Sequence, residues 1–231
     1  MTWWTTTLGG AIAHELAPWA YWHARCMVLA WGVLLPLGAL GARYWKIAPA
    51  QRWPQALDSK LWWHAHLALQ WLGVVLMSVG VALAWGQATG ASAAALLHAW
   101  AGWAVVVLGW LQGISGLARG SKGGPTDAQP QGDHYDMSAH RRRFERWHKA
   151  AGWLCVLLAL AVIALGLWLA DAPRWMAFWL AIWWGLLALL AARWQRQGRC
   201  VDTYQAIWGP DPRHPGNHQQ PIGWGVRRPQ P

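Results

Sequence analysis

Five stretches of the chain are apolar and long enough to cross a lipid bilayer, and this feature constrains the fold more than any other. They lie at about residues 19–42, 61–85, 91–117, 147–170 and 175–192. A membrane-spanning helix needs roughly 20 mostly apolar residues. The connections GQATGAS and DAPR are short, so successive helices are expected to run antiparallel. The sequence therefore predicts an all-α integral membrane bundle of five transmembrane helices, with a kink at Pro36.

The composition agrees with a membrane protein. Only 12% of the residues are charged and 55% are hydrophobic, whereas soluble domains carry about 25% charged residues. The 24 tryptophans are typical of helices whose ends lie at a bilayer interface. We expect residues 19–193 to form the membrane domain. Residues 1–18 are expected to form a short outside or interfacial tail, and residues 194–231 a cytoplasmic tail rich in Pro, Gly and His, extended or irregular and packed over the bundle.

The formal net charge of +10 comes mostly from one side of the predicted bundle. With five crossings, the first-to-second loop, the third-to-fourth loop and the C-terminal tail share that side. Its cations are Arg43, Lys46, Arg52, Lys60, Arg119, Lys122, Arg141, Arg142, Arg143, Arg146, Lys149, Arg193, Arg196 and Arg199. The opposite side has little beyond Arg25 and Arg174. Positively charged short loops stay cytoplasmic. This predicts an inner cell membrane protein with an outside N-terminus, and it argues against nucleic acid as a partner.

Four histidines lie near the ends of predicted spans, where an ionisable group is costly and indicates a function. His23 and His98 begin spans that start outside, whereas His66 and His148 begin spans that start inside. Each level thus has two histidines from alternate helices, which can be diagonal neighbours in a four-helix bundle. Two imidazoles on facing helices are a ligand set that an iron porphyrin accepts. Because no CxxCH motif occurs, covalent haem attachment is not indicated.

Small residues follow three of these histidines along the same helix faces, because residues four apart share a face. The three faces read His66, Gln70, Gly73, Met77 and Gly80; His98, Gly102, Val105, Gly109, Gln112 and Gly116; and His148, Gly152, Cys155, Ala159 and Gly166. Small side chains would leave room for a flat macrocycle, although ordinary packing between membrane helices also favours them. Gln70 and Gln112 need buried partners, and we expect them to bond across helices or to water and to help order the site.

His64 is the alternative to His66 as a ligand. The two residues point to nearly opposite faces of a helix, and His66 shares its face with Gln70. We therefore take His66 as the ligand and His64 as a flanking residue or a contact to a haem propionate.

Cations near the predicted sites are candidates to pair with haem propionates or to attract an anionic donor. They are Arg25 at the outer level and Arg143, Arg146 and Lys149 at the inner level, and anchoring at the headgroups is the alternative. His14 is expected outside the haem set. His134, His140, His214 and His218 are expected to be solvated rather than to bind metal.

These motifs resemble the cytochrome b561 family, in the form found as the membrane core of DOMON-linked members and their bacterial relatives. The matching pieces are HARCMVLAWGVLLPLGALGARYWK, WWHAHLALQ, HAWAGWAVVVLGWLQ and GDHYDMSAHRRRFERWHKAAGW, which cover most of residues 23–170. The resemblance implies a four-helix core with two non-covalent b haems and one extra helix. It implies that His23 pairs with His98 and His66 with His148, the pairing that the topology also gives.

The resemblance further implies transmembrane electron transfer, often from ascorbate to ferric iron or monodehydroascorbate. The chain departs from the family pattern in two ways. No DOMON-like segment is found, and the family's basic ascorbate contacts match only loosely, at Arg43 and Lys46.

Three functions are compatible with the sequence. The first is a stand-alone transmembrane oxidoreductase, such as a ferric or monodehydroascorbate reductase. The second is a cytochrome subunit that passes electrons between quinol and a partner protein. The third is a metal transporter or a structural subunit, which the near absence of Asp and Glu in the spans disfavours. Expected partners are lipid, a small-molecule or protein donor and acceptor, and either a second copy of the chain or a redox subunit.

Overall fold

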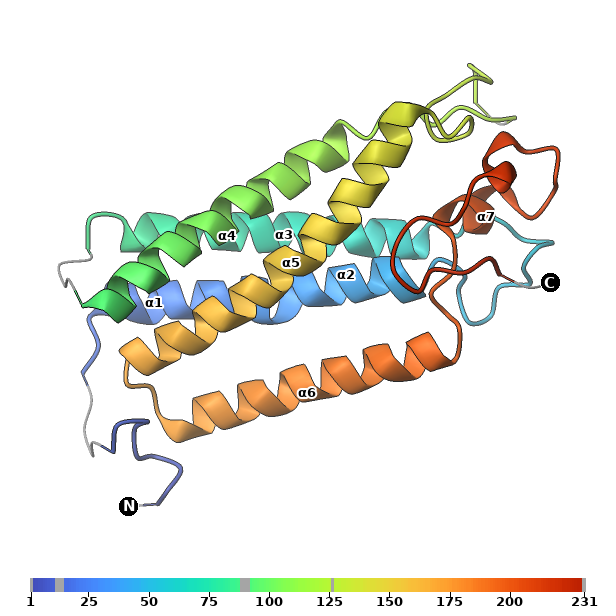
Figure 1. Cartoon of the computed structure of the whole chain (residues 1–231). Helices are drawn as coiled ribbons and strands as arrows, with labels where there is room; N and C mark the ends of the chain where they lie inside the picture. Colours follow the sequence, from blue (N-terminus) through green and yellow to red (C-terminus); the bar gives the residue numbers. More distant parts are fainter. Residues whose placement is uncertain (1, 11–14, 88–91, 126, 230–231) are drawn as a thin grey trace. The chain divides into compact units, whose positions relative to one another are not determined.

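The computed structural model describes residues 2–10, 15–87, 92–125 and 127–229, and helices dominate this part of the chain (Figure 1). Among these residues, five helices are long and apolar enough to cross a membrane: Pro18–Tyr44, Leu61–Ala84, Ala93–Leu117, Ala139–Leu169 and Arg174–Arg196. Pairing of extended backbone in the described ranges is limited to isolated bridges. The all-α fold with five membrane-spanning helices is therefore confirmed.

The first span is built from three helical stretches: α1 (Pro18–Met27), a π-helical stretch η1 (Val28–Leu34) and α2 (Leu35–Tyr44). The π-helical stretch ends just before Pro36, where the sequence predicts a kink. Pro36 has no N–H to offer to the carbonyl oxygen of Gly32, four residues earlier. That oxygen instead accepts hydrogen bonds from the indole nitrogens of Trp183 (3.0 Å) and Trp184 (3.2 Å). A backbone acceptor at membrane depth is thus satisfied by side chains of the fifth span.

The other spans are α3 (Leu61–Ala84), α4 (Ala93–Leu117), α5 (Ala139–Leu169) and α6 (Arg174–Arg196). Their apolar parts agree with the sequence-based ranges, although residue 91, the expected start of the third span, lies outside the described residues. Helix α5 begins at Ala139 instead of near residue 147. Its first turns are rich in arginine, so hydropathy alone does not detect them, but they continue the same helix.

The chain divides into two compact units, each made of three segments. The first unit comprises Met1–Pro36, Leu69–Trp110 and Leu154–Leu190, and the second comprises Leu37–Ala68, Leu111–Trp153 and Ala191–Pro231. Helices α3 to α6 contribute to both. His23 and His98 belong to the first unit, whereas His66 and His148 belong to the second. Each predicted pair therefore lies within one unit.

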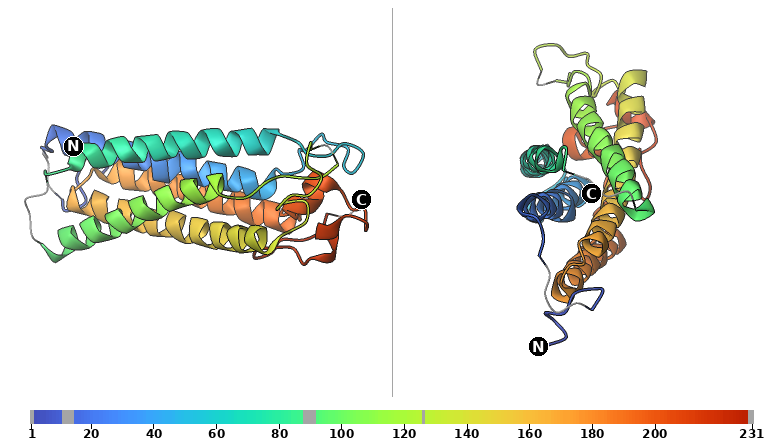
Figure 2. Two further views of the ribbon diagram at one scale, coloured as in Figure 1. Left: turned by 90° about the horizontal axis from the view of Figure 1, so that it is seen from above. Right: turned by 90° about the vertical axis from the view of Figure 1, so that its left-hand side faces the viewer.

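The core of the first unit is apolar and lies among the first four spans. Its buried members are Ala30, Trp31, Leu35, Val74, Met77, Val105, Cys155, Val156, Ala159 and Ile163. Helix α6 packs against this core through the partly buried Leu180 and Trp184. Figure 2 shows α1 beside α3, where Gly80 allows close approach: a Cβ atom there would lie 3.0 Å from the Cβ atom of Cys26.

The N-terminal segment of the first unit is tied to the link between α5 and α6. Thr7 forms an antiparallel bridge with Pro173. The Leu8 N–H donates to the Ala172 carbonyl (3.0 Å), and the Arg174 N–H donates to the Thr6 carbonyl (3.1 Å). The expected N-terminal tail therefore has defined backbone contacts at residues 6–8.

The C-terminal segment of the second unit is not irregular throughout. It contains α7 (Thr203–Trp208) and the 3-10 turn η2 (Pro215–His218). Tyr204 and Trp208 are buried with Met137 and Ile222 in a small core. Figure 1 shows α7 next to the loop after α2, and the Asp58 N–H donates to the Ala206 carbonyl there (3.2 Å).

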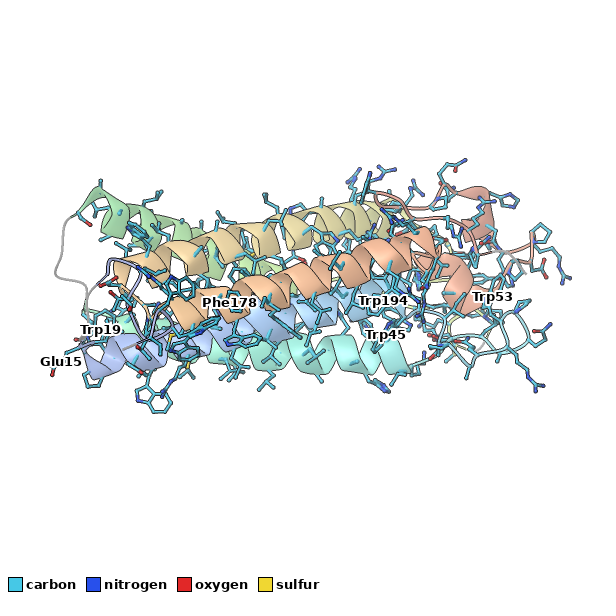
Figure 3. All side chains as sticks on the ribbon, turned by 90° about the horizontal axis from the view of Figure 1, so that it is seen from below. Glu15, Trp19, Trp45, Trp53, Phe178 and Trp194 are labelled. Atoms are coloured by element: carbon cyan, nitrogen blue, oxygen red, sulfur yellow. The ribbon has the colours of Figure 1, made fainter. Side chains whose placement is uncertain are left out.

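Aromatic contacts hold the end of α6 against the same loop. Trp45 and Trp194, both labelled in Figure 3, lie edge to face with ring centroids 5.8 Å apart. The indole N–H of Trp53 donates to the Gln205 carbonyl (3.2 Å). Within the second unit, the C-terminal segment therefore contacts the loop after α2.

Candidate metal-binding site: two pairs of histidines

The first pair joins α1 and α4. The rings of His23 and His98 lie with centroids 6.3 Å apart and planes at 76°. The Nδ1–H group of His23 donates to the Gly80 carbonyl on α3 (2.8 Å). This bond leaves Nε2 of His23 available to a ligand, and metal-binding histidines commonly donate their other ring N–H in this way.

His98 is closely packed against α5. A Cβ atom at Gly166 on α5 would lie 2.8 Å from its Cε1 atom, so only glycine leaves room for this ring. The Nδ1 atom of His98 is buried, and no group in the described ranges makes a hydrogen bond of good geometry with it, although the Val162 backbone lies beside the ring.

The second pair joins α3 and α5. The rings of His66 and His148 lie with centroids 6.4 Å apart and planes at 77°. The Nδ1–H group of His66 donates to the Gly38 carbonyl on α2 (3.1 Å). His64, the alternative ligand, is exposed. The face of α3 that points to α5 therefore carries His66.

His148 has side-chain partners on α4. Its Nδ1 atom lies 3.2 Å from Oγ of Ser115, and the Ser115 hydroxyl donates to the Gln112 carbonyl (2.9 Å). The Gln112 amide also lies beside this ring. With its nitrogen toward His148, the amide donates to the His148 carbonyl (3.1 Å) and to Nδ1 of the His148 ring (2.8 Å), while its oxygen accepts from the Gly152 N–H (3.3 Å).

The spacing of both pairs fits one iron between two imidazoles. Two imidazole–metal bonds of about 2.0 Å, with each ring nitrogen about 1.2 Å from its ring centre, separate the two ring centres by roughly 6.4 Å. The observed separations are 6.3 and 6.4 Å. Among the described residues, no group of three or more His, Cys, Asp or Glu side chains is placed to hold a metal ion. A pair of imidazoles suits a metal whose remaining ligands come from a macrocycle.

The glycines of the predicted faces divide into two groups. A Cβ atom at Gly73 or Gly109 would crowd the Leu35, Trp31 or Met77 side chains, so these glycines serve helix packing. At three others an added Cβ atom would have more room: the nearest atom would be 3.9 Å away in His148 at Gly116, 3.6 Å away in the Gln112 amide at Gly152, and 4.0 Å away in Val162 at Gly102. These three positions are the least crowded glycines of the predicted faces.

Gln70 does not face a histidine. Its amide nitrogen donates to the Leu35 carbonyl (3.1 Å), next to Pro36. It bonds across helices, as expected for a buried amide, and its contact stabilises the proline-containing segment of the first span.

The cations near the pairs are engaged elsewhere or exposed. Arg25 lies over the rings of Tyr21 (4.5 Å) and Trp22 (4.9 Å), and Arg143 and Arg146 are exposed. Lys149 donates to Glu145 (2.6 Å) and to the Ile222 carbonyl (2.6 Å). Any role of these residues toward a propionate group stays a prediction.

The remaining histidines of the described ranges do not join either pair. His134 is buried between Tyr204 and Trp208, so the expectation that it is solvated is wrong, because the C-terminal segment covers it. His140 bonds to the Ala118 carbonyl (2.8 Å), and His218 is exposed. His214 lies 5.7 Å from Tyr135, centroid to centroid. His14 lies outside the described residues.

Sequence reasoning missed Ser115 and the glycine carbonyls that orient the rings. Ser115 is three residues after Gln112, on the same helix face, and this spacing is the signal that could have identified it. The carbonyls of Gly38 and Gly80 carry no such signal, since every residue has one.

Membrane-spanning helices that bring histidines together in pairs at this spacing define a membrane cytochrome. The chain belongs to the cytochrome b561 family: the family model described as eukaryotic cytochrome b561 matches residues 22–170. Membership of this family implies b-type haem as the cofactor, and the five apolar helices imply a lipid environment.

Among similar proteins are two from Arabidopsis thaliana. A cytochrome b561 and DOMON domain-containing protein is 28% identical over 148 residues, which are 63% of this chain and 27% of that protein. A cytochrome b561, DM13 and DOMON domain-containing protein is 28% identical over 162 residues, which are 70% of this chain and 16% of that protein. The chain thus spans about a quarter or less of these two relatives. No solved structure shows significant similarity to it.

Proposed function

We propose that this chain carries electrons across the membrane through two b haems, one bound by His23 and His98 and the other by His66 and His148. One observation carries the proposal: two pairs on different helices independently have the ring separation, 6.3 and 6.4 Å, that bis-imidazole ligation requires. A bound haem supplies reversible one-electron chemistry, and with imidazoles on both faces its iron has no open position for substrate.

The chain's own residues supply ligands, orientation and apolar surroundings. The Gly80 and Gly38 carbonyls hold the Nδ1 protons of His23 and His66, so that Nε2 is the free nitrogen in each ring. An apolar core lies in the same unit as the first pair. Different surroundings of the two pairs are expected to give them different midpoint potentials.

The distribution of charge supports an outside N-terminus and a cytoplasmic C-terminus in an inner cell membrane. Of the 19 Lys and Arg residues, Arg25 and Arg174 belong to the first unit and the other 17 to the second. Short cationic loops stay on the cytoplasmic side. The pair His66 and His148 would then be the cytoplasmic one.

The electron donor that we propose is a small ascorbate- or quinol-like reductant, with an acceptor on the other side of the membrane. A stand-alone protein of this kind would be an oxidoreductase of the ferric or monodehydroascorbate reductase type. The second candidate is a cytochrome subunit working between quinone and a partner protein. It is favoured by the names of the relatives, which combine the cytochrome b561 region with a DOMON domain in one longer chain.

Haem counting in the purified protein tests the proposal. Reduced-minus-oxidised spectra and pyridine haemochrome analysis should give two b haems per chain. His98→Ala and His148→Ala should each leave one haem, whereas His64→Ala, at an exposed histidine of the same helix as His66, should leave two. Two haems in both ligand variants, or a colourless protein after expression with ample haem, would contradict it.

Proteoliposomes separate the two candidate functions. Protein reconstituted alone, with ascorbate or quinol on one side and ferricyanide on the other, should transfer electrons if it acts by itself. Haem reduction by quinol without reduction of the enclosed ferricyanide would instead support the subunit. Reduction by neither donor would overturn the proposed donor class.

A further inference from the structure

The C-terminal segment, residues 200–228, is bound by three cations that come from different parts of the second unit. Each cation donates a hydrogen bond to a backbone carbonyl of this segment. The bonds run from Arg43 on α2 to Trp224 (2.7 Å), from Lys46 after α2 to Val201 (2.9 Å), and from Lys149 on α5 to Ile222 (2.6 Å). The segment thus occupies positive groups contributed by two helices and a loop.

These carbonyl acceptors do not balance the positive charge. A peptide oxygen carries only a partial negative charge, and a buried lysine normally has a charged partner. In the described ranges no carboxylate forms an ion pair with Arg43 or Lys46, although Lys46 is buried, and only Lys149 has such a partner, Glu145 (2.6 Å). Asp202 of the segment is buried as well, but it joins none of the ion pairs of the described residues. Three cations thus stand against two carboxylates, and positive charge remains in excess.

The same contacts tie the segment to the proposed cytoplasmic haem site. Lys149 directly follows the proposed ligand His148 in the chain. Arg43 lies on α2, whose Gly38 carbonyl accepts a hydrogen bond from the ring of His66 (3.1 Å). The segment is therefore bound to the helix that carries one proposed ligand and to the helix that orients the other.

Docking of the segment leaves buried polar atoms unsatisfied. Among the described residues, Nε1 of Trp208, Oε1 of Gln205 and Nε2 of His134 have no hydrogen-bond partner. These atoms would be hydrated if the segment moved away, so their burial reduces the free energy gained by docking. The anchors act in the opposite direction: the Tyr204 hydroxyl donates to the Tyr135 carbonyl (2.9 Å), and the Trp208 ring lies 5.2 Å from the Tyr135 ring, centroid to centroid. Docking is thus a balance that substitution of Tyr204 and Trp208 can shift.

We propose that the C-terminal segment is an autoinhibitory cover: when docked it occupies Arg43, Lys46 and Lys149, and when released it exposes them to an anionic reductant of the cytoplasmic haem. The proposal rests on the proposed function, because it needs a haem between His66 and His148. Opposite charge speeds the approach of an anionic reductant and has little effect on a neutral one. The reductant loses one electron, which reduces one ferric iron, and any proton that it loses goes to solvent.

Reduction kinetics of the full chain with Tyr204→Ala and Trp208→Ala together test this inference. Faster limited proteolysis should show that the segment is released, and the haem count that two haems remain. Adding His98→Ala to the double variant and to the unchanged protein leaves the cytoplasmic haem to be followed alone. Its reduction by ascorbate, an anion at neutral pH, should become severalfold faster on release, and added salt should diminish the gain. Reduction by a neutral short-chain quinol should keep its rate.

Three further variants separate the effect of charge from a general loosening of the protein. Lys46→Met, added to the double variant, should remove part of the ascorbate gain, because one attracting charge is lost. His218→Ala is the matched control, since His218 is exposed in the same segment and should change neither rate. Trp53→Phe removes a single bond to the segment, the one to the Gln205 carbonyl (3.2 Å). It should give a smaller gain of the same sign, and it decides the test if the double variant loses the haem.

The outcomes distinguish this inference from the proposed function. Fewer than two haems in the unchanged protein would overturn the proposed function and the inference with it. With two haems present, an unchanged ascorbate rate after release of the segment would overturn the inference alone. An equal gain with ascorbate and with the neutral quinol, or a gain that Lys46→Met leaves complete or His218→Ala shares, would do the same.

Discussion

The Nζ atom of Lys46 donates a hydrogen bond of 2.9 Å to the carbonyl oxygen of Val201, and this ammonium group is buried. Its neighbour Arg43 acts in the same way, donating to the Trp224 carbonyl (2.7 Å) and to Gln195 (3.1 Å). These are the two residues that loosely match the family's basic ascorbate contacts. In this chain both bind the C-terminal part of the second unit.

The attachment of the C-terminal segment should depend on alkaline pH through Lys46. Burial, and next the charge of Lys149, lower the pKa of Lys46 from 10.5 to about 8. An undocked segment exposes a lysine that holds its proton up to about pH 10.5. Between pH 8 and 10.5 the undocked state binds more protons, so docking strengthens as the pH rises through this window and loses this contribution as the pH falls to 8.

Limited proteolysis of the C-terminal segment measures this effect. Resistance should increase from pH 8 to pH 10 in the unchanged protein, and Lys46→Met should abolish the increase. Lys60→Met is the control, because the Lys60 side chain is 52% exposed and should leave the increase intact. An identical pH profile for Lys46→Met and the unchanged protein would refute the prediction.

His134 should make the stability of the second unit sensitive to acid. Burial, and then the Arg141 charge, lower the pKa of His134 to about 3, whereas an unfolded histidine takes up a proton near pH 6.5. The unfolded state therefore binds more protons between these values, and stability falls as the pH drops below 6.5. Thermal unfolding of His134→Phe, which keeps an aromatic ring beside Tyr204, should lose part of this dependence between pH 6.5 and 4.5. The exposed His218→Phe should not.

Helix α6 should be held in the first unit by the two indoles that bond to Gly32. Replacing both Trp183 and Trp184 by Phe leaves that carbonyl without either donor, and an unmade buried hydrogen bond costs roughly 1–3 kcal/mol. Each single change should cost less, because the other indole still donates. In detergent, the melting temperature should fall further in the double variant than in either single variant. Trp179→Phe is the neutral control, because the Trp179 side chain is 58% exposed. Equal effects of the single and double changes would speak against it.

Gly166→Ala should disturb the haem proposed at His23 and His98 and spare the other. The added Cβ atom would lie 2.8 Å from Cε1 of His98, so the ring must tilt. We expect an altered EPR signal or loss of one haem. Gly185→Ala is the matched control, since nothing lies within 4 Å of its added Cβ atom. Intact spectra in Gly166→Ala would show that the ring does not need this space.

Particular residues show how far sequence reasoning extends. Hydropathy placed α3, α4 and α6, but it put the start of α5 near residue 147, because the arginine-rich turns from Ala139 have a helical backbone without an apolar composition. His66 could be preferred to His64 from helical periodicity alone, and the structure places His66 opposite His148. His134 was expected in solvent, since nothing nearby in the chain signals that Tyr204 and Trp208 cover it.

By itself the sequence determined the five spans, the family, the uneven distribution of cations and the four histidine positions. All of these follow from local properties: the length of an apolar run, the charge of a loop and the 3.6-residue period of a helix. Only the tertiary structure decided which carbonyl or hydroxyl meets each imidazole, that two indoles satisfy Gly32, and that Lys46 binds the C-terminal segment. These contacts join residues distant in the chain, and they depend on how closely packed helices approach, which no local pattern records.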